Sequence, residues 1–219
     1  MKTITSLTLL PLLLACGGAA GAHSHAHPHS HGHSHGAQDG ARTTEGFRAH
    51  HAEIRTKLDE AAERAMALPS APPEEVGELI HGIVHFFQHE LMPHAQAEER
   101  VLYAVADRLV PTPHGRRYTD ALRYEHTVVA REVAALHDAM RSGDHSPEAL
   151  AAIQRRTLEL VGLVKAHFGV EEEVVLTVFD ELMSAEEFER EVVAPMHASG
   201  GEAHEHGDAH EHGEGAHEH

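Results

Sequence analysis

Two segments of the chain place a glutamate four residues after a histidine: His94 precedes Glu98, and His167 precedes Glu171. On a helix, side chains four residues apart lie one turn apart on the same face. Each segment could therefore present an imidazole and a carboxylate side by side, and both groups are ligands of transition metals. The chemistry that this spacing favours is metal binding.

Histidines also interrupt the apolar pattern of four segments. Apolar residues recur there every three or four positions, which is typical of the buried face of a helix. Each segment places one histidine in that series, and two segments add a glutamate one turn later. The pattern predicts four histidines and two glutamates in one core. The inward series are Phe47, His51, Ile54, Leu58, Ala61, Ala65 and Leu68; Ile80, Val84, Phe87, Leu91, His94, Glu98, Val101 and Val105; Leu122, His126, Val129, Val133, Leu136 and Met140; and Leu150, Ile153, Leu160, Val164, His167, Glu171, Val174 and Val178.

Six polar groups in one core need partners. An unpaired buried polar group costs about 1–3 kcal/mol by mutational measures, and a whole domain is stable by only about 5–15 kcal/mol. A hydrogen-bonded network of histidines and glutamates is one way to satisfy these groups, and metal ions are the other. We favour metal, because each of the four segments contributes a member of the set.

The chain also repeats itself. Residues 94–109 align with residues 167–182, with identical residues at seven of sixteen positions, including the histidine and two glutamates. The segment that begins at His51 similarly aligns with the one that begins at His126. The repeat predicts two helix pairs related by a pseudo-twofold axis. Such symmetry would give two equivalent His/His/Glu sets, which suit two metals bridged by carboxylates.

Prolines and capping residues divide the chain into elements. Helices are expected at about residues 44–68, 73–109, 114–141 and 146–183, and Pro93 is expected to kink the second. Ser146 and Pro147 begin the fourth, while Ser184 and Glu187 have the spacing of a capping box that starts a short fifth helix. No segment alternates with the period of two typical of strands. The prediction is an all-α, up-down-up-down four-helix bundle.

The four-helix pattern resembles the hemerythrin-like (HHE cation-binding) family, which has single histidines on helices 1 and 3 and His-x-x-x-Glu on helices 2 and 4. Residues 92–103 and Glu125-His126 are especially similar, and the resemblance covers about residues 43–192. Membership would imply a non-haem site of two irons with bridging carboxylates and an open position for O2 or a related small ligand. The ligands that the resemblance implies are His51, His94, Glu98, His126, His167 and Glu171.

The chain departs from this family at one position. Oxygen-carrying hemerythrins have a second histidine on the third helix, whereas Leu122 and Ala130 stand one turn either side of His126. One iron would lack a nitrogen ligand, which weakens reversible O2 carriage and favours sensing, iron binding or redox chemistry. Some family members instead place the last carboxylate five residues after the histidine. That spacing selects Glu172, although the inward series favours Glu171.

Three more histidines, His81, His85 and His89, are spaced to form a line on the second helix. They could clamp a surface Zn²⁺, Ni²⁺ or Cu²⁺, but we favour a solvated polar face. A kink at Pro93 would be one way to turn His89 inward. The sequence indicates no substrate pocket, so an enzyme is not predicted, even though a di-iron centre with an open position can activate O2 or peroxide.

The two ends of the chain differ from its middle. Residues 1–15 read as a signal peptide, and Leu13-Leu14-Ala15-Cys16 resembles a bacterial lipobox, which predicts lipidation of Cys16 and an extracytoplasmic, membrane-anchored lipoprotein. Residues 16–42 read as a tether, residues 43–195 as the bundle and residues 196–219 as a tail without a fold of its own. Seven histidines lie between residues 23 and 35 and six between 204 and 219, which predicts Zn, Ni or Cu binding by these ends.

Charge excludes one class of partner. The chain has 17 Lys+Arg against 35 Asp+Glu, a formal net charge of −18. It therefore lacks the basic face that neutralises phosphates, and a nucleic-acid partner is not expected. Two functions remain: a di-iron protein that binds O2, a related small ligand or iron itself, and a transition-metal binding or delivery protein that acts through its histidine-rich ends.

Overall fold

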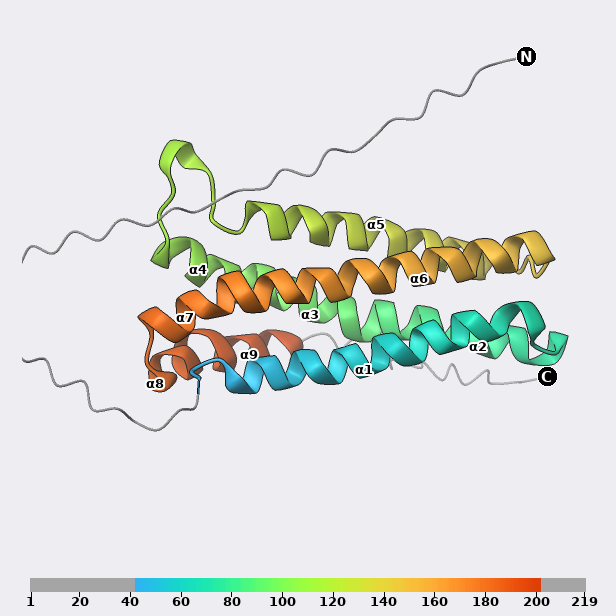
Figure 1. The fold of residues 1–219 in the computed structure, drawn as a ribbon, viewed down its shortest axis with the longest axis horizontal. Coiled ribbons are helices and arrows are strands. Elements are labelled where there is room, and N and C mark those ends of the chain that lie inside the picture. The colour runs from blue at the N-terminus through green and yellow to red at the C-terminus, as the bar shows by residue number, and fades with distance from the viewer. Residues whose placement is uncertain (1–41, 202–219) are drawn as a thin grey trace, which may run out of the picture. The chain divides into compact units, whose positions relative to one another are not determined.

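The computed structural model describes residues 42–201, and within that range the ordered elements are helices, with no strand. Two long helices are uninterrupted, while two others continue through wider π turns (Figure 1). A shorter helical segment follows them. The helices are α1 (Glu45–Ala67); α2 (Pro73–Phe86), α3 (Met92–Ala97) and α4 (Tyr103–Leu109); α5 (Asp120–Ser142); α6 (Pro147–Val170) and α7 (Leu176–Leu182); and α8 (Ala185–Phe188) and α9 (Ala194–Gly201).

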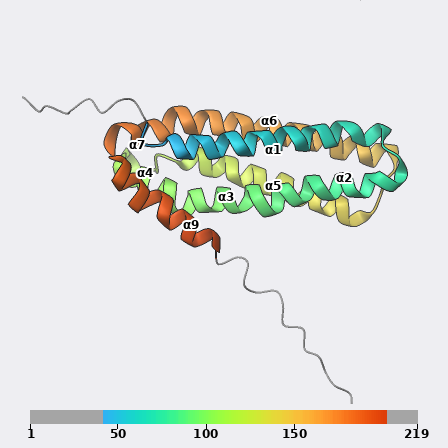
Figure 2. The same cartoon turned by 90° about the horizontal axis from the view of Figure 1, so that it is seen from below.

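The long helices lie side by side (Figures 1 and 2). Helix α1 packs against α2 and α6, and α5 packs against the same two helices, while α4 packs against α7. Helix α9 crosses this group and packs on α3. None of the helices within residues 42–201 is both long and apolar enough to cross a membrane.

The core consists of two apolar clusters. The larger includes Ile54, Phe87, Val129 and Val164, and the smaller includes Phe47, Leu102, Leu122 and Val175. On each long helix the chain passes from one cluster to the other at the histidine predicted as a ligand. The predicted ligands therefore form a polar layer between two apolar regions.

The second helical segment widens rather than simply kinking near Pro93. A π turn spans Phe87–Leu91, just before the proline. Proline lacks an N–H and its ring crowds the carbonyl four residues earlier, that of His89, so a wider turn relieves both problems. His89 stays exposed, so the turn does not bring it into the core.

Two further π turns begin at the predicted glutamate ligands, at Glu98–Leu102 and Glu171–Val175. Each adds about one residue to a turn, so the inward face shifts by one position beyond it. The inward position predicted at Val174 was therefore wrong: Val174 is 43% exposed, while Val175 and Leu176 are buried. Val178, also predicted inward, is half-buried. In the equivalent turn Leu102 is buried and Val101 is only half-buried.

The caps confirm two predicted helix starts. Ser146 accepts a hydrogen bond from the amide of Ala149 at the start of α6, and Ser184 and Glu187 form the expected capping box of α8. The third helix begins later than predicted, at Asp120, because His114 has a left-handed backbone (φ 64°) that a right-handed helix excludes.

At the C-terminal side, α9 runs to Gly201, six residues past the boundary expected at 195. The predicted signal peptide, the lipidation of Cys16 and the tether up to residue 41 lie outside the described residues. The tail from residue 202 onward lies outside them too.

Candidate metal centre

All six predicted core ligands are buried. His51, Glu98 and Glu171 have no exposed surface, and the other three are at most 9% exposed. They come from α1, α3, α5, α6 and the two π turns that begin at the glutamates. The structure therefore brings together every residue of the predicted core set. The three members of this set with a small exposed surface are His94, His126 and His167.

Glu98 lies between three of the histidines. Its Oε1 is 3.2 Å from Nε2 of His51 and 2.7 Å from Nε2 of His94, and its Oε2 is 3.4 Å from Nε2 of His126. One carboxylate thus faces histidines of both halves of the repeat. This is the arrangement that a carboxylate bridging two cations requires.

Glu171 occupies the equivalent place from the other half. Its Oε2 is 3.5 Å from Nε2 of His51 and 3.9 Å from Nε2 of His167. The Nε2 atoms of His126 and His167 are 3.0 Å apart. Two groups of buried side chains could hold a metal ion: His51, His94 and Glu98, and Glu98, His126 and His167.

The outer ring nitrogens fix which inner nitrogens carry a lone pair. Nδ1 of His51 lies 3.1 Å from Glu172, Nδ1 of His126 lies 3.1 Å from Glu99, and Nδ1 of His167 lies 2.8 Å from Glu125. A carboxylate can only accept a hydrogen bond, so each Nδ1 carries the proton and a neutral ring then has its lone pair on Nε2. Carboxylates behind metal-bound histidines commonly play this orienting role.

The inner atoms fit a metal better than a hydrogen-bond network. With Nε2 unprotonated, His126 and His167 direct two lone pairs at each other across 3.0 Å. His94 Nε2, Glu98 Oε2 and both oxygens of Glu171 are buried without a hydrogen-bond partner; the 2.7 Å contact of His94 with Glu98 lacks hydrogen-bond geometry. Converging lone pairs of this kind are satisfied by a cation, and buried orphans are otherwise costly.

The pKa values of the two core glutamates are shifted in opposite directions. Burial acts to raise the pKa of Glu98, but in the absence of metal the rings of His94, His126 and His51, when protonated toward it, hold this pKa well below its usual value. Burial raises the pKa of Glu171 well above its usual value, and the negative charge of Glu98 adds to the rise. Two buried carboxylates this close repel each other when both are charged, and a bound cation would relieve that repulsion.

Glu171 and Glu172, the two alternatives for the last carboxylate, are now distinguished by position. Glu171 faces the other ligands, whereas Glu172 lies behind His51, where Arg55 also binds it at 2.7 Å. Burial acts to raise the pKa of Glu172, but the hydrogen bond and the charge of Arg55 outweigh it, so the pKa is lowered. Glu172 is therefore placed to orient His51 rather than to meet the ions directly.

His94 differs from the other three histidines. The position equivalent to Glu125 is occupied by His50, whose ring lies edge-on to that of His94 at 5.1 Å between centroids. Burial, followed by the neighbouring charge of His94, lowers the pKa of His50. The histidine without a carboxylate behind it is thus the one at the edge of the cluster.

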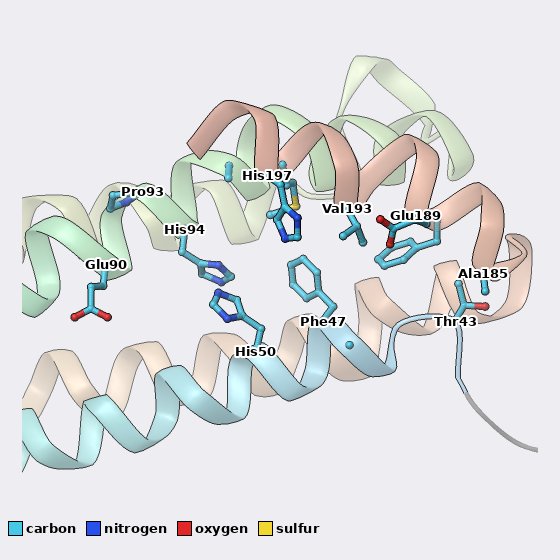
Figure 3. Close-up of a pocket in the computed structure, with 14 residues that line it drawn as sticks. Thr43, Phe47, His50, Glu90, Pro93, His94, Ala185, Glu189, Val193 and His197 are labelled. Carbon is cyan, nitrogen blue, oxygen red and sulfur yellow. The ribbon is translucent and has the colours of Figure 1, made fainter. Parts of the chain in front are cut away.

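A cavity of about 730 Å³ reaches this edge. Figure 3 shows His50 and His94 pointing into it from α1 and α3, with Phe47 beside them and the segment of α8 and α9 along the other wall. Its lining is largely apolar, with Phe47, Phe188 and Val193 among the wall residues. Nothing in the sequence indicates this cavity.

The surface histidines are placed as expected from their spacing. His81, His85 and His89 are exposed, with neighbouring ring centroids 5.9 and 4.8 Å apart. Within residues 42–201, the side chains whose ligand atoms converge closely enough for a metal belong to the core set. The three histidines form an exposed polar face, and metal binding by them stays a prediction.

Tyr103 is a further member of the site that sequence analysis missed. It is completely buried, and its hydroxyl lies 3.3 Å from Nε2 of His167 and 3.5 Å from Nε2 of His126. Nine residues after His94, it would point away from the core on an ideal helix, and the π turn at Glu98–Leu102 brings it inward. Burial, followed by the charges of Glu98 and Glu171, raises its pKa.

Compared with protein-family models, curated proteins and solved structures, the chain matches none of them. The interpretation therefore depends on its own residues. Helices that carry buried His/Glu groups able to hold a metal fit a hemerythrin-like bundle.

Proposed function

We propose that this chain is a hemerythrin-like protein with an up-down-up-down bundle that holds two irons, and that it binds O2, a related small ligand or iron itself. The observation that carries the proposal is the sharing of Glu98 by two groups of ligands, His51 with His94 and His126 with His167. The pair of irons would supply binding or activation of a small oxidant at an open position. The ligands we assign are the residues that the resemblance implies, including Glu171.

Spacing supports two ions rather than one. First-row metals bind imidazole and carboxylate at about 2.0–2.2 Å, so ligand atoms of one ion lie about 3 Å apart. The contacts of Glu98 Oε1 with His51 and His94 have this spacing, and so has the contact between His126 and His167. The two groups share a carboxylate, which matches a bridged pair.

The cavity supports a small ligand as the partner of this centre. It joins the cluster at His94, the ligand that lacks a carboxylate behind it, and its walls are mainly apolar. A neutral molecule as small as O2 would enter such a space without a desolvation cost. Small-ligand binding is therefore favoured over a purely structural metal site, which is usually closed.

A second candidate function uses the histidine-rich ends. The thirteen histidines at residues 23–35 and 204–219 favour capture of Zn, Ni or Cu. With Cys16 lipidated, the chain would be held at a membrane on the extracytoplasmic side, and the bundle would receive or store metal that the ends collect.

The experiment that separates the two candidates is metal analysis of the chain without residues 1–16 and of a second form reduced to residues 42–201. Both forms are purified, loaded with ferrous iron, exposed to air and measured for iron content and optical spectrum. We expect two irons in the shorter form and the absorption of an oxo-bridged ferric pair, lost in His94→Ala and His167→Ala but kept in His85→Ala, the exposed control on the same helical segment as His94. Loss of all core metal with the ends would refute the di-iron proposal.

A further inference from the structure

One buried polar group of the centre, the hydroxyl of Tyr103, has no function assigned so far. Tyr103 lies between the histidines of the second ligand group, with its ring stacked on that of His126 at 5.4 Å and the guanidinium of Arg123 5.3 Å from the ring centroid. Both contacts come from α5 and hold the ring in place. Its hydroxyl is therefore fixed in direction, toward Nε2 of His126 and His167.

The hydroxyl depends on atoms that the metal would use. Its hydrogen-bond neighbours in the part of the chain that the structure describes are these two Nε2 atoms and the carboxylate of Glu171, and all three belong to residues assigned as ligands. Once these nitrogens bind a cation, their lone pairs are no longer available as acceptors. A hydroxyl buried without a partner costs about 1–3 kcal/mol. The oxygen must then interact with the cation or with something that the cation holds.

Spacing favours the cation itself. The hydroxyl oxygen and the two Nε2 atoms are 3.0, 3.3 and 3.5 Å apart. Three ligand atoms at neighbouring corners of an octahedron are about 3 Å apart when each bond is about 2.0–2.1 Å. The three atoms therefore have the spacing of one face of a coordination sphere.

The two halves of the repeat differ at this point. The residue equivalent to Tyr103 is Leu176, which is also completely buried and offers no ligand atom. The pseudo-symmetry of the ligands is thus broken by one oxygen, on the side of His126 and His167. On the opposite side, His94 faces the cavity.

We propose that the oxygen of Tyr103 is a further ligand of the ion held by His126 and His167, so that the two ions of the centre are chemically different. The inference rests on the proposed di-iron function. When the metal–oxygen bond forms, the O–H bond breaks and its proton leaves to solvent, with no change of oxidation state. An anionic oxygen ligand favours the ferric form of that ion. The other ion, next to the cavity, keeps the open position.

The chain is suited to a spectroscopic test because it has three tyrosines, Tyr103, Tyr118 and Tyr124. The histidine-rich ends contain none, so iron bound there cannot produce a tyrosinate signal. The full chain is loaded with iron in air. We expect a phenolate-to-iron charge-transfer band in the visible and resonance-enhanced tyrosine ring vibrations.

The decisive variant is Tyr103→Phe, which keeps the ring and removes only the oxygen. We expect complete loss of the charge-transfer band and of the ring vibrations, with unchanged iron content and unchanged helical circular dichroism. Tyr124→Phe, at a side chain that is 68% exposed, is the matched control and should keep the full signal.

The outcomes separate this inference from the proposed function. Core iron that is lost in His94→Ala but shows no tyrosinate signal overturns the role of Tyr103 and leaves the di-iron proposal standing. A signal that persists in Tyr103→Phe overturns it too. Absence of core iron from the native chain overturns both.

Discussion

Asp107 and Asp180 occupy equivalent places in the two halves of the repeat. Each carboxylate binds the start of the first helix of the other half: Asp180 at α1 and Asp107 at α5. Asp180 accepts the amide of Thr44 at 2.9 Å and its hydroxyl at 3.0 Å, while Asp107 accepts the same groups of Thr119 at the same two distances. The arginine four residues after each threonine binds the same carboxylate at 3.1 Å. The repeat predicted from sequence therefore extends to hydrogen bonds.

Removing either carboxylate should weaken the fold to a similar degree. We expect Asp107→Ala and Asp180→Ala each to lower the free energy of unfolding by about 1.5–3 kcal/mol, the range for hydrogen bonds to charged groups. Urea unfolding followed by circular dichroism measures this. Asp138→Ala, on the exposed face of α5, should change it by less than about 0.5 kcal/mol. A large effect at only one of the two aspartates would contradict the equivalence of the halves.

The glutamates at 171 and 172 should respond differently to the same substitution. Glu171→Gln removes a proposed ligand and should abolish binding of the second iron. Glu172→Gln removes the group behind His51 and should weaken iron affinity by about 10–100-fold, the usual effect of losing such a partner. Iron titration with a competing chelator measures both. If Glu172→Gln abolished binding and Glu171→Gln did not, the ligand would be Glu172.

Protein freed of metal by a chelator should show opposite pH dependences at the two core glutamates. The raised pKa of Glu171 means that its stabilising contribution is present below the unfolded pKa of about 4.3 and is lost as pH rises through the folded pKa. The lowered pKa of Glu98 means that its contribution is present above about pH 4.3 and is lost as pH falls.

The measurement is urea unfolding of the native chain and the two glutamine variants, metal-free, between about pH 4 and pH 8. Glu171→Gln should gain stability relative to the native chain as pH rises, because glutamine stays neutral. Glu98→Gln should be less stable than the native chain at neutral pH, and the difference should shrink as pH falls. The same trend in both variants would disprove the opposite titration of the pair.

Narrowing the cavity should slow ligand entry without removing the metal. Ala97 lines the cavity next to His94, and Ala97→Phe would project a ring into it. We expect slower binding of azide to the iron-loaded protein, measured by stopped-flow absorbance, with unchanged iron content. Val170→Phe is the control, because Val170 is the equivalent residue in the other half and is 47% exposed. Equal rates in both variants and the native chain would show that ligands enter elsewhere.

The sequence predicted the helices and the burial of the core histidines and glutamates because both depend on local spacing. His51, His94, His126 and His167 interrupt apolar series of helical period, and burial makes such interruptions informative. The order of the helices and two of their caps also followed from proline and serine positions.

The features that the sequence did not predict depend on backbone detail and on packing. Counting 3.6 residues per turn through Glu98 and Glu171 placed Val174 inward and left Tyr103 outward, because it did not foresee the π turns. The late start of α5 depends on the left-handed backbone of His114. The cavity depends on where α8 and α9 pack, and the short pattern around Ser184 carries no information about that.

The polar layer between the two apolar clusters has a consequence for how the molecule unfolds. The smaller cluster, which includes Phe179, is separated from the larger one by this polar layer. Within the layer, His94, Glu98 and Glu171 have buried atoms that lack a hydrogen-bond partner without a cation. Regions joined so weakly tend to open as separate cooperative units. In protein freed of metal by a chelator, we expect amide hydrogen exchange to be faster in α4, α7 and α8 than in α2. Iron should bring the two regions to one common rate, so that the bundle behaves as a single folding unit only when loaded.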